Sequence, residues 1–321
     1  MFIVNLNNYF MKKNIIWSLL FYFMASNAFS IESEKCTSVR FSDVGWTDIS
    51  TTTSLASIVL EALGYHTDIK LLSVPITFKS LKDKTIDVFL GDWIPSMSSH
   101  IKPYILDKSI EVVHENLKGA KYTLAVNAAA VSLGIKDFKD ISLHKDALKG
   151  NIYGIDPGND GNTHILDMIA KNKFNLKGFH LVESSEQGML AQVMRSERDN
   201  QPIVFLAWEP HPMNINFKIN YLTGGDEYFG PNFGEAIVYT VVRSDYLKEC
   251  PNVAQFLRNL TFSLKMENEI MDEILNKKKD PKIAGKKWLS NNTKILDSWL
   301  SGVVDIKGNY DLASVKKKLQ D

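Results

Sequence analysis

Short apolar segments with strand character alternate with helical segments along most of the chain. The series opens with a strand over 38–41, a helix over 52–63 and a second strand over 66–72. Further strands are expected over 86–90, 122–126, 152–155, 203–206 and 237–243, and helices over 78–84, 163–171, 186–195, 253–264, 267–276, 283–290 and 293–300. A helix between two strands returns the chain to the same end of the sheet. The sequence therefore predicts an α/β fold with mainly parallel sheets.

The chain is long enough for two domains, because it has 321 residues of which 45% are hydrophobic. It contains no internal repeat and no low-complexity linker between them. A second domain inserted in the middle would require two crossings between domains. We expect these crossings to be strand-like, at 117–122 and 222–226.

Residues 1–30 have the order of a secretory signal. The pair Lys12-Lys13 precedes an apolar run over 15–25, and small residues then offer cleavage after Ala28 or Ser30. The run is short for a membrane span, although an N-terminal anchor is the alternative. The ten residues at the very start are interpreted as an upstream extension. We therefore expect export to the periplasm.

The charge balance excludes some classes of partner. The chain has 37 Lys+Arg and 37 Asp+Glu, and removing residues 1–30 with their two lysines leaves 35 against 37, a net charge of −2. Such a chain has no broad basic field, so nucleic acid is not an expected partner. Two cysteines exclude a zinc site with four thiolates, and we expect neither a metal nor a cofactor.

The two cysteines, Cys36 and Cys250, are separated by 214 positions. In an exported protein an even number of cysteines is most simply explained by one disulfide, although two buried free thiols are the alternative. A bridge would join the first and last portions of the chain. This layout agrees with a second domain inserted between them.

Three of the five tryptophans beyond the signal segment stand at equivalent places. Trp46, Trp93 and Trp208 each follow an apolar strand-like segment, and in two cases a glycine within two residues, Gly45 or Gly91, is expected to let the chain turn. Ligands of open α/β sheets bind beyond the carboxyl ends of the strands, so the three indoles are predicted to meet in one cleft. The alternative is that each indole packs beneath a loop. Trp288 and Trp299 lie at helical apolar positions, which indicates core packing.

Several indole faces around a small volume are typical of sites for quaternary ammonium ions. Asp48 lies two residues after Trp46, where a carboxylate would attract a cation, accept a hydrogen bond from a hydroxyl group and repel a ligand carboxylate. A polar turn over 156–162 follows another strand-like segment. The alternatives are a helix N-cap for Asp48 and turn chemistry alone for 156–162.

The sequence lacks the motifs that would indicate an enzyme. It has no G-x-S-x-G, no H-E-x-x-H, no Walker loop and no G-x-G-x-x-G after a strand. Of the seven histidines only His211 stands beside the predicted cleft, and we interpret it as a structural hydrogen-bonding residue. No catalytic residue is therefore predicted.

Six segments of the chain resemble the choline-binding proteins of bacterial ABC transporters. The segments are 41–49, 88–93, 156–162, 183–190, 207–213 and 221–226. The resemblance extends from about Val39 to Leu300, which is nearly the whole chain after the signal segment.

The resemblance implies a type II periplasmic-binding-protein fold. In that fold two α/β lobes, joined by a hinge of two strands, close over a ligand in the cleft between them. Lobe 1 would comprise residues 31–119 and 225–321, and lobe 2 residues 120–224. The disulfide of the family maps onto Cys36 and Cys250, in agreement with the argument above.

The resemblance also implies the ligand contacts. In that family four aromatic side chains surround the trimethylammonium group of choline, and they map onto Trp46, Trp93, Tyr122 and Trp208. The family's contacts to the choline hydroxyl group map onto Asp48 and Asn159. Tyr122 enters only through the resemblance.

We therefore expect a monomeric, non-enzymatic receptor that captures choline with high affinity and delivers it to the membrane permease of an ABC transporter. The nearest alternative is a receptor for glycine betaine or proline betaine, which Asp48 disfavours because such ligands carry a carboxylate. Alternatives from other classes are a secreted choline-ester hydrolase and a sensory receptor domain.

Overall fold

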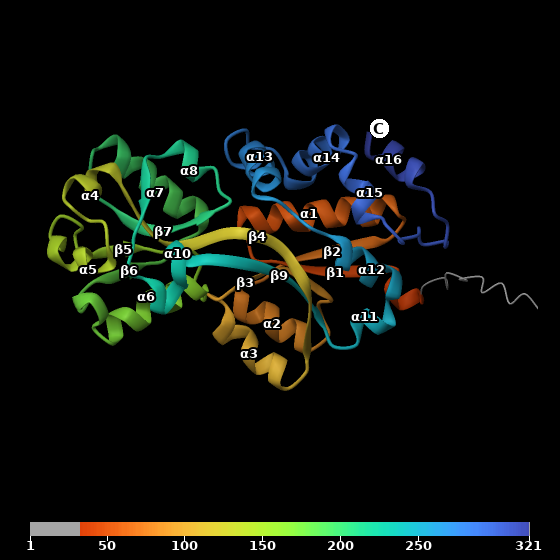
Figure 1. The fold of residues 1–321 in the computed structure, drawn as a ribbon, viewed down its shortest axis with the longest axis horizontal. Helices are drawn as coiled ribbons and strands as arrows, with labels where there is room; N and C mark the ends of the chain where they lie inside the picture. Colours follow the sequence, from red (N-terminus) through yellow and green to blue (C-terminus); the bar gives the residue numbers. More distant parts are fainter. Residues whose placement is uncertain (1–32, 321) are drawn as a thin grey trace, which may run out of the picture. The chain divides into compact units, whose positions relative to one another are not determined.

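A mixed sheet of nine strands organises residues 33–320, which this computed structural model describes (Figure 1). The predicted signal segment lies outside the described residues. The strands are β1 (Ser38–Asp43), β2 (His66–Leu71), β3 (Val88–Ile94), β4 (Ile110–Asn127), β5 (Asn151–Tyr153), β6 (His180–Val182), β7 (Val204–Glu209), β8 (Ile219–Tyr221) and β9 (Glu235–Arg243). Their order is β2-β1-β3-β9-β4-β7-β5-β6, with β8 paired to β4.

The sheet is parallel at both ends and antiparallel in the middle. Strand β1 pairs in parallel with β2 and β3, and β5 pairs in parallel with β6 and β7. Strand β9 is antiparallel to β3 and β4, and β4 is antiparallel to β7 and β8. The prediction of a mainly parallel sheet therefore holds for the two ends only, because helices connect strands there.

The long strands β4 and β9 lie side by side and join the two parallel parts (Figure 1). The strand predicted over 122–126 and the strand-like crossing predicted at 117–122 both lie in β4, and the start of this strand was missed because the polar run His114-Glu115-Asn116 interrupts its apolar pattern. The strand character predicted for the crossing at 222–226 is wrong. Thr223 there makes only an isolated bridge to Asp137, and the strand beside β4 is β9.

Helices cover the sheet. The longer ones are α1 (Thr47–Ala62), α2 (Val74–Lys82), α3 (Ser98–Leu106), α6 (Asp160–Ala170), α7 (Glu186–Arg198), α12 (Pro251–Asn259), α13 (Leu264–Leu275), α14 (Pro281–Asn291) and α16 (Leu312–Gln320). The short ones are α4 (Ala128–Ser132), α5 (Phe138–Ile141), α8 (Met213–Asn216), α9 (Asp226–Phe229), α10 (Pro231–Gly234), α11 (Tyr246–Glu249) and α15 (Ile295–Trp299). No helix in the described part of the chain is long and apolar enough to span a membrane.

Helix α1 is the central helix of the first parallel part. All its residues except Ser50 and Glu61 are buried, because it contacts α13, α14 and α16 as well as β1, β2 and β3. It begins at Thr47, five residues before the predicted start at 52. Trp46 thus stands at the N-terminus of α1, at the end of the sheet where β1 and β3 finish.

The predicted disulfide between Cys36 and Cys250 is confirmed, with Cα atoms 5.5 Å apart. Both residues are fully buried. The bridge ties the segment before β1 to the start of α12. It therefore links the first and last portions of the chain within one part of the sheet.

Candidate functional site

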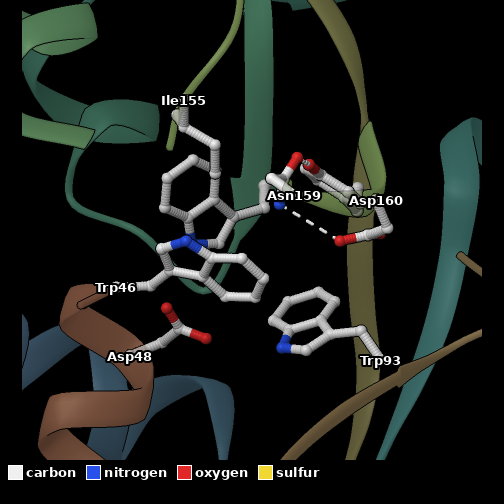
Figure 2. Close-up of a pocket in the computed structure, with 8 residues that line it drawn as sticks. Trp46, Asp48, Trp93, Ile155, Asn159 and Asp160 are labelled. Atoms are coloured by element: carbon white, nitrogen blue, oxygen red, sulfur yellow. Dashed lines mark hydrogen bonds between the residues drawn. The ribbon is translucent and has the colours of Figure 1, made fainter. Parts of the chain in front are cut away.

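One buried pocket gathers all six residues predicted to bind a ligand (Figure 2). It is lined by Trp46, Asp48, Trp93, Tyr122, Ile155, Asn159, Asp160 and Trp208. Each of the four aromatic side chains is at most 6% exposed. The pocket is therefore closed from solvent in this conformation.

A tight turn between β1 and α1 positions Trp46. Gly45 has a φ of +85°, a conformation that side chains with a Cβ rarely adopt. The carboxylate of Asp43 accepts hydrogen bonds from the Gly45 N–H at 2.8 Å and from the Ser50 hydroxyl at 2.7 Å. The glycine therefore does provide the turn expected before Trp46.

Trp93 lies within β3, one residue before its end, rather than after the strand. The glycine near it has a different role from the predicted turn. A Cβ on Gly91 would lie 2.5 Å from Cδ1 of Ile49 in α1, so a larger residue here would require the Ile49 side chain to shift. Gly91 thus leaves room for the Ile49 side chain beside the strand that carries Trp93.

Tyr122 and Trp208 are direct partners across the antiparallel pair β4 and β7. Directly paired residues project from the same face of a sheet. Their rings lie edge to face with centroids 6.4 Å apart, and Tyr122 makes a similar contact with Trp93 at 6.1 Å. Trp208, like Trp93, lies inside its strand. Three of the four rings thus form one continuous aromatic wall.

Asn159 is the N-cap of α6 and also lines the pocket. Its Oδ1 accepts hydrogen bonds from the Asn162 N–H at 3.0 Å and from the Tyr122 hydroxyl at 2.8 Å. Its Nδ2 donates to Asp160 at 3.1 Å (Figure 2). An amide nitrogen carries two protons, so one N–H remains to donate to a ligand oxygen.

Asp48 is not the N-cap of α1, because that position is occupied by Trp46. Its side chain is 1% exposed and points from α1 toward the indole of Trp46 (Figure 2). Its Oδ1 has no hydrogen-bond partner among the described residues. Burial, with a contribution from the Glu186 carboxylate, raises the pKa of Asp48 to about 8. A cation in the pocket would favour its ionised form.

Further buried carboxyl groups surround the pocket, and the sequence had not singled them out. Burial raises the pKa of Asp160 to about 7, and burial together with Asp160 raises the pKa of Asp92 to about 8. Burial, then Asp48, raises the pKa of Glu267 well above its ordinary value. Asp160 belongs to the polar turn at 156–162, so the sequence could have indicated it as a pocket residue. Glu267 lies in an ordinary helical segment, where no signal existed.

No lysine, arginine or histidine among residues 33–320 lines this pocket. Among residues 33–320 there is also no group of three His, Cys, Asp or Glu side chains that could hold a metal ion. A cavity with aromatic walls, buried carboxyl groups and no cationic side chain is chemically suited to an organic cation. Its neutral polar donor, Asn159, suits a hydroxyl group on the same molecule.

His211 lies beside the pocket but does not line it. Its Nε2 lies 2.9 Å from the Glu186 carboxylate, and its Nδ1 accepts a hydrogen bond from the Met213 N–H at 2.9 Å. Both ring nitrogens are therefore engaged, in agreement with the predicted structural role. Trp299 is fully buried in the core as predicted, and Trp288 is partly buried against it.

Comparisons with known proteins identify the family. A family model for the substrate binding domain of ABC-type glycine betaine transport systems matches residues 37–291. A solved ABC-transporter choline binding protein in complex with choline is 62% identical, covers 90% of this chain and 100% of its own, and superposes with a TM-score of 0.89. A structure described as an ABC-transporter choline binding protein in an unliganded semi-closed conformation is also 62% identical. It covers 89% of this chain and 99% of its own, and it superposes with a TM-score of 0.83.

A curated relative from Chromohalobacter salexigens, named as uncharacterized protein ORF1, is 48% identical over 140 residues, which are 44% of this chain and 88% of that protein. The likeness to the choline complex confirms the predicted fold class, a mixed α/β periplasmic-binding-protein fold. The family consists of binding proteins rather than enzymes, as predicted. The chain belongs to the family of substrate-binding domains of ABC-type glycine betaine transport systems.

Proposed function

We propose that this protein captures choline outside the cytoplasm and delivers it to the permease of an ABC transporter. The observation that carries the proposal is the closed pocket with four aromatic side chains, two lining carboxyl groups and no cationic side chain. It is supported by the 62% identity to a choline binding protein solved with choline. The secretory signal predicted at residues 1–30 supports a periplasmic location.

The pocket would hold the two ends of choline differently. The trimethylammonium group cannot donate a conventional hydrogen bond, so it would contact the faces of Trp46, Trp93 and Trp208, each contributing about 0.5–2 kcal/mol. The hydroxyl group would donate to the unpartnered oxygen of Asp48 and accept the remaining N–H of Asn159. Ionised Asp48 would also attract the positive charge.

We propose that two lobes close over the ligand, with the strands β4 and β9 as the hinge. The expected lobes are residues 31–119 with 225–321, and residues 120–224. The packing of Phe229 favours a later return to lobe 1, because its ring lies 5.9 Å from that of Phe138 and 5.3 Å from that of His164. The segment 230–234 is then the better place for the second crossing. The receptor would act as a monomer.

A choline receptor is distinguished from a glycine betaine receptor by the acids in its pocket. Betaine has the same trimethylammonium group but carries a carboxylate, which the ionised forms of Asp48 and Asp160 would repel. We expect calorimetry on the mature protein to give a micromolar or tighter Kd for choline and a Kd at least 100-fold weaker for betaine. The Asp48→Asn variant is expected to narrow this ratio at least tenfold. Absence of choline binding, or a preference for betaine, would contradict the proposal.

The affinity for choline is expected to rise with pH. Burial raises the pKa of Asp48 from 3.8 to about 8, so in the empty closed pocket this carboxyl group is mostly protonated at neutral pH. A bound cation favours the carboxylate, so binding releases a proton, and linkage limits the change in Kd to about tenfold per pH unit. We expect the Kd at pH 6 to be at least about fivefold weaker than at pH 8.

The stability of the ligand-free closed state should change in the opposite direction. A carboxyl group with a raised pKa stabilises the folded state at low pH, and this contribution is lost as pH rises from 3.8 through about 8.

Calorimetric titrations with choline in buffers of different ionisation enthalpy measure the protons that are released on binding. In the Asp48→Asn variant the pH dependence of the Kd for choline should shrink to the part that is due to Asp160. A Kd that is constant from pH 6 to pH 8 would refute the coupling.

A further inference from the structure

We propose that Glu186 is a latch that holds the pocket closed by capping helix α1 from the opposite side of the cleft. The inference rests on the proposed function and on the lobes proposed with it. Glu186 is the first residue of α7 in lobe 2, and its side chain is fully buried. Its carboxylate joins two residues, Thr47 and His211, each of which is next to a wall of the pocket.

The start of α1 lacks a cap of its own. The first N–H groups of a helix have no acceptor within the helix, and a Ser, Thr, Asp or Asn side chain usually accepts one of them. The N-cap of α1 is Trp46, whose indole accepts no such bond. The Thr47 N–H instead donates to Oε2 of Glu186 at 2.7 Å, and the Thr47 hydroxyl donates to Oε1 at 2.7 Å.

These two bonds connect residues separated by 139 positions in the chain. The negative carboxylate also faces the positive end of the α1 dipole, which strengthens the contact. Thr47 stands between Trp46 and Asp48, the two lobe 1 residues at the start of α1 that line the pocket. The bonds can therefore form only when both neighbours are in their positions around the closed pocket.

The third bond ties Glu186 to the other wall. Because Nδ1 of His211 accepts from the Met213 N–H, the proton is assigned to Nε2, which donates to Oε1 of Glu186 at 2.9 Å. The His211 ring lies edge to face with Trp208, with centroids 4.7 Å apart. The carboxylate is thus held in lobe 2 by the same histidine that supports an aromatic side chain of the pocket.

A latch of this kind acts on the lifetime of the complex. In the open protein water would hydrate both the Thr47 N–H and the Glu186 carboxylate, so the latch contributes nothing to the encounter with a ligand. On opening, the two Thr47 bonds must break together. Glu186 does not line the pocket and is a positioning residue, so its contribution should be equal for ligands with and without a hydroxyl group.

The exchange rate of the Thr47 amide tests the latch directly in the ligand-free full chain. Glu186 is the acceptor of this N–H, so we expect Glu186→Gln to exchange it at least tenfold faster than the wild type does. Glu197→Gln makes the same chemical change on the same helix and should leave the rate unchanged. Unchanged exchange in Glu186→Gln would overturn the proposal, whether or not choline binds.

Dissociation kinetics test the functional consequence. Stopped-flow tryptophan fluorescence should show that Glu186→Gln raises koff about 10- to 100-fold and changes kon less than threefold. The factors by which koff rises for choline and for tetramethylammonium should agree within threefold. Thr47→Val, which keeps the N–H, should raise koff less, and the double variant should show less than the product of both factors. Thr47→Ser keeps both bonds and should match the wild type.

The outcomes separate the two proposals. If the wild type binds no choline, the proposed function fails and amide exchange alone decides the latch. If choline binds but koff is unchanged in both Glu186→Gln and Thr47→Val, the latch is refuted and the function stands. Should Glu186→Gln fail to fold, Thr47→Val decides the kinetic question by itself.

Discussion

Replacement of Trp93 by alanine is expected to weaken choline binding by at least 100-fold. The side chain would supply a cation–π contact of up to about 2 kcal/mol and an apolar wall of about 1.5–3 kcal/mol. A loss of about 3 kcal/mol corresponds to on the order of 100-fold in Kd. Calorimetry on the purified variant measures this loss, and Trp93→Phe, which keeps a ring, should lose about tenfold or less.

The matched control is Trp288→Ala. Trp288 stands on α14, is only partly buried and donates from Nε1 to Glu269 at 2.7 Å, and it does not line the pocket. This change should lower stability slightly and leave the Kd within twofold. Equal losses of affinity in both variants would point to general damage. An unchanged Kd in Trp93→Ala would remove Trp93 from the binding site.

Removal of the disulfide is expected to cost stability without costing affinity. The bridge closes a loop of 214 residues, for which the loop-entropy relation gives about 5 kcal/mol, while native bridges typically contribute 2–5 kcal/mol. We therefore expect the double variant Cys36→Ser/Cys250→Ser to lose about 3–5 kcal/mol of unfolding free energy. Denaturant titration followed by circular dichroism measures this change.

Two comparisons make the disulfide result specific. Reduced wild-type protein should unfold at the same denaturant concentration as the double variant. The Kd for choline should stay within twofold, because neither cysteine lines the pocket. An unchanged unfolding midpoint would show that other contacts already fix the start of β1 to α12.

The sequence was sufficient wherever a local pattern is tied to a local structure. The strand before Trp46 and the helix after it were predicted because periodicity and a turn glycine act over a few residues. The disulfide was predicted because only one pairing of Cys36 and Cys250 exists. Trp93 and Trp208 were placed at strand ends correctly, although both lie inside their strands rather than after them.

The features that sequence reasoning missed depend on contacts between distant segments. Gly91 was interpreted as a turn residue, and its actual role is to leave room for Ile49. Glu186 was part of a family-like segment, but its bond to Thr47 spans 139 positions and leaves no pattern in the sequence. The start of β4 was missed because its neighbour β9 stabilises it. Such pairings override local propensity.

The register between β4 and β7 has a consequence for how a ligand first meets the protein. Tyr122 and Trp208 face each other across neighbouring strands of one sheet, so their relative position is set by backbone pairing rather than by the opening of the cleft. In the proposed movement of the two lobes, this pair would keep its geometry when Trp46 and Trp93 move away. Capture of a ligand would then proceed in two stages, with a weak first contact on Tyr122 and Trp208 and enclosure by Trp46 and Trp93 afterwards.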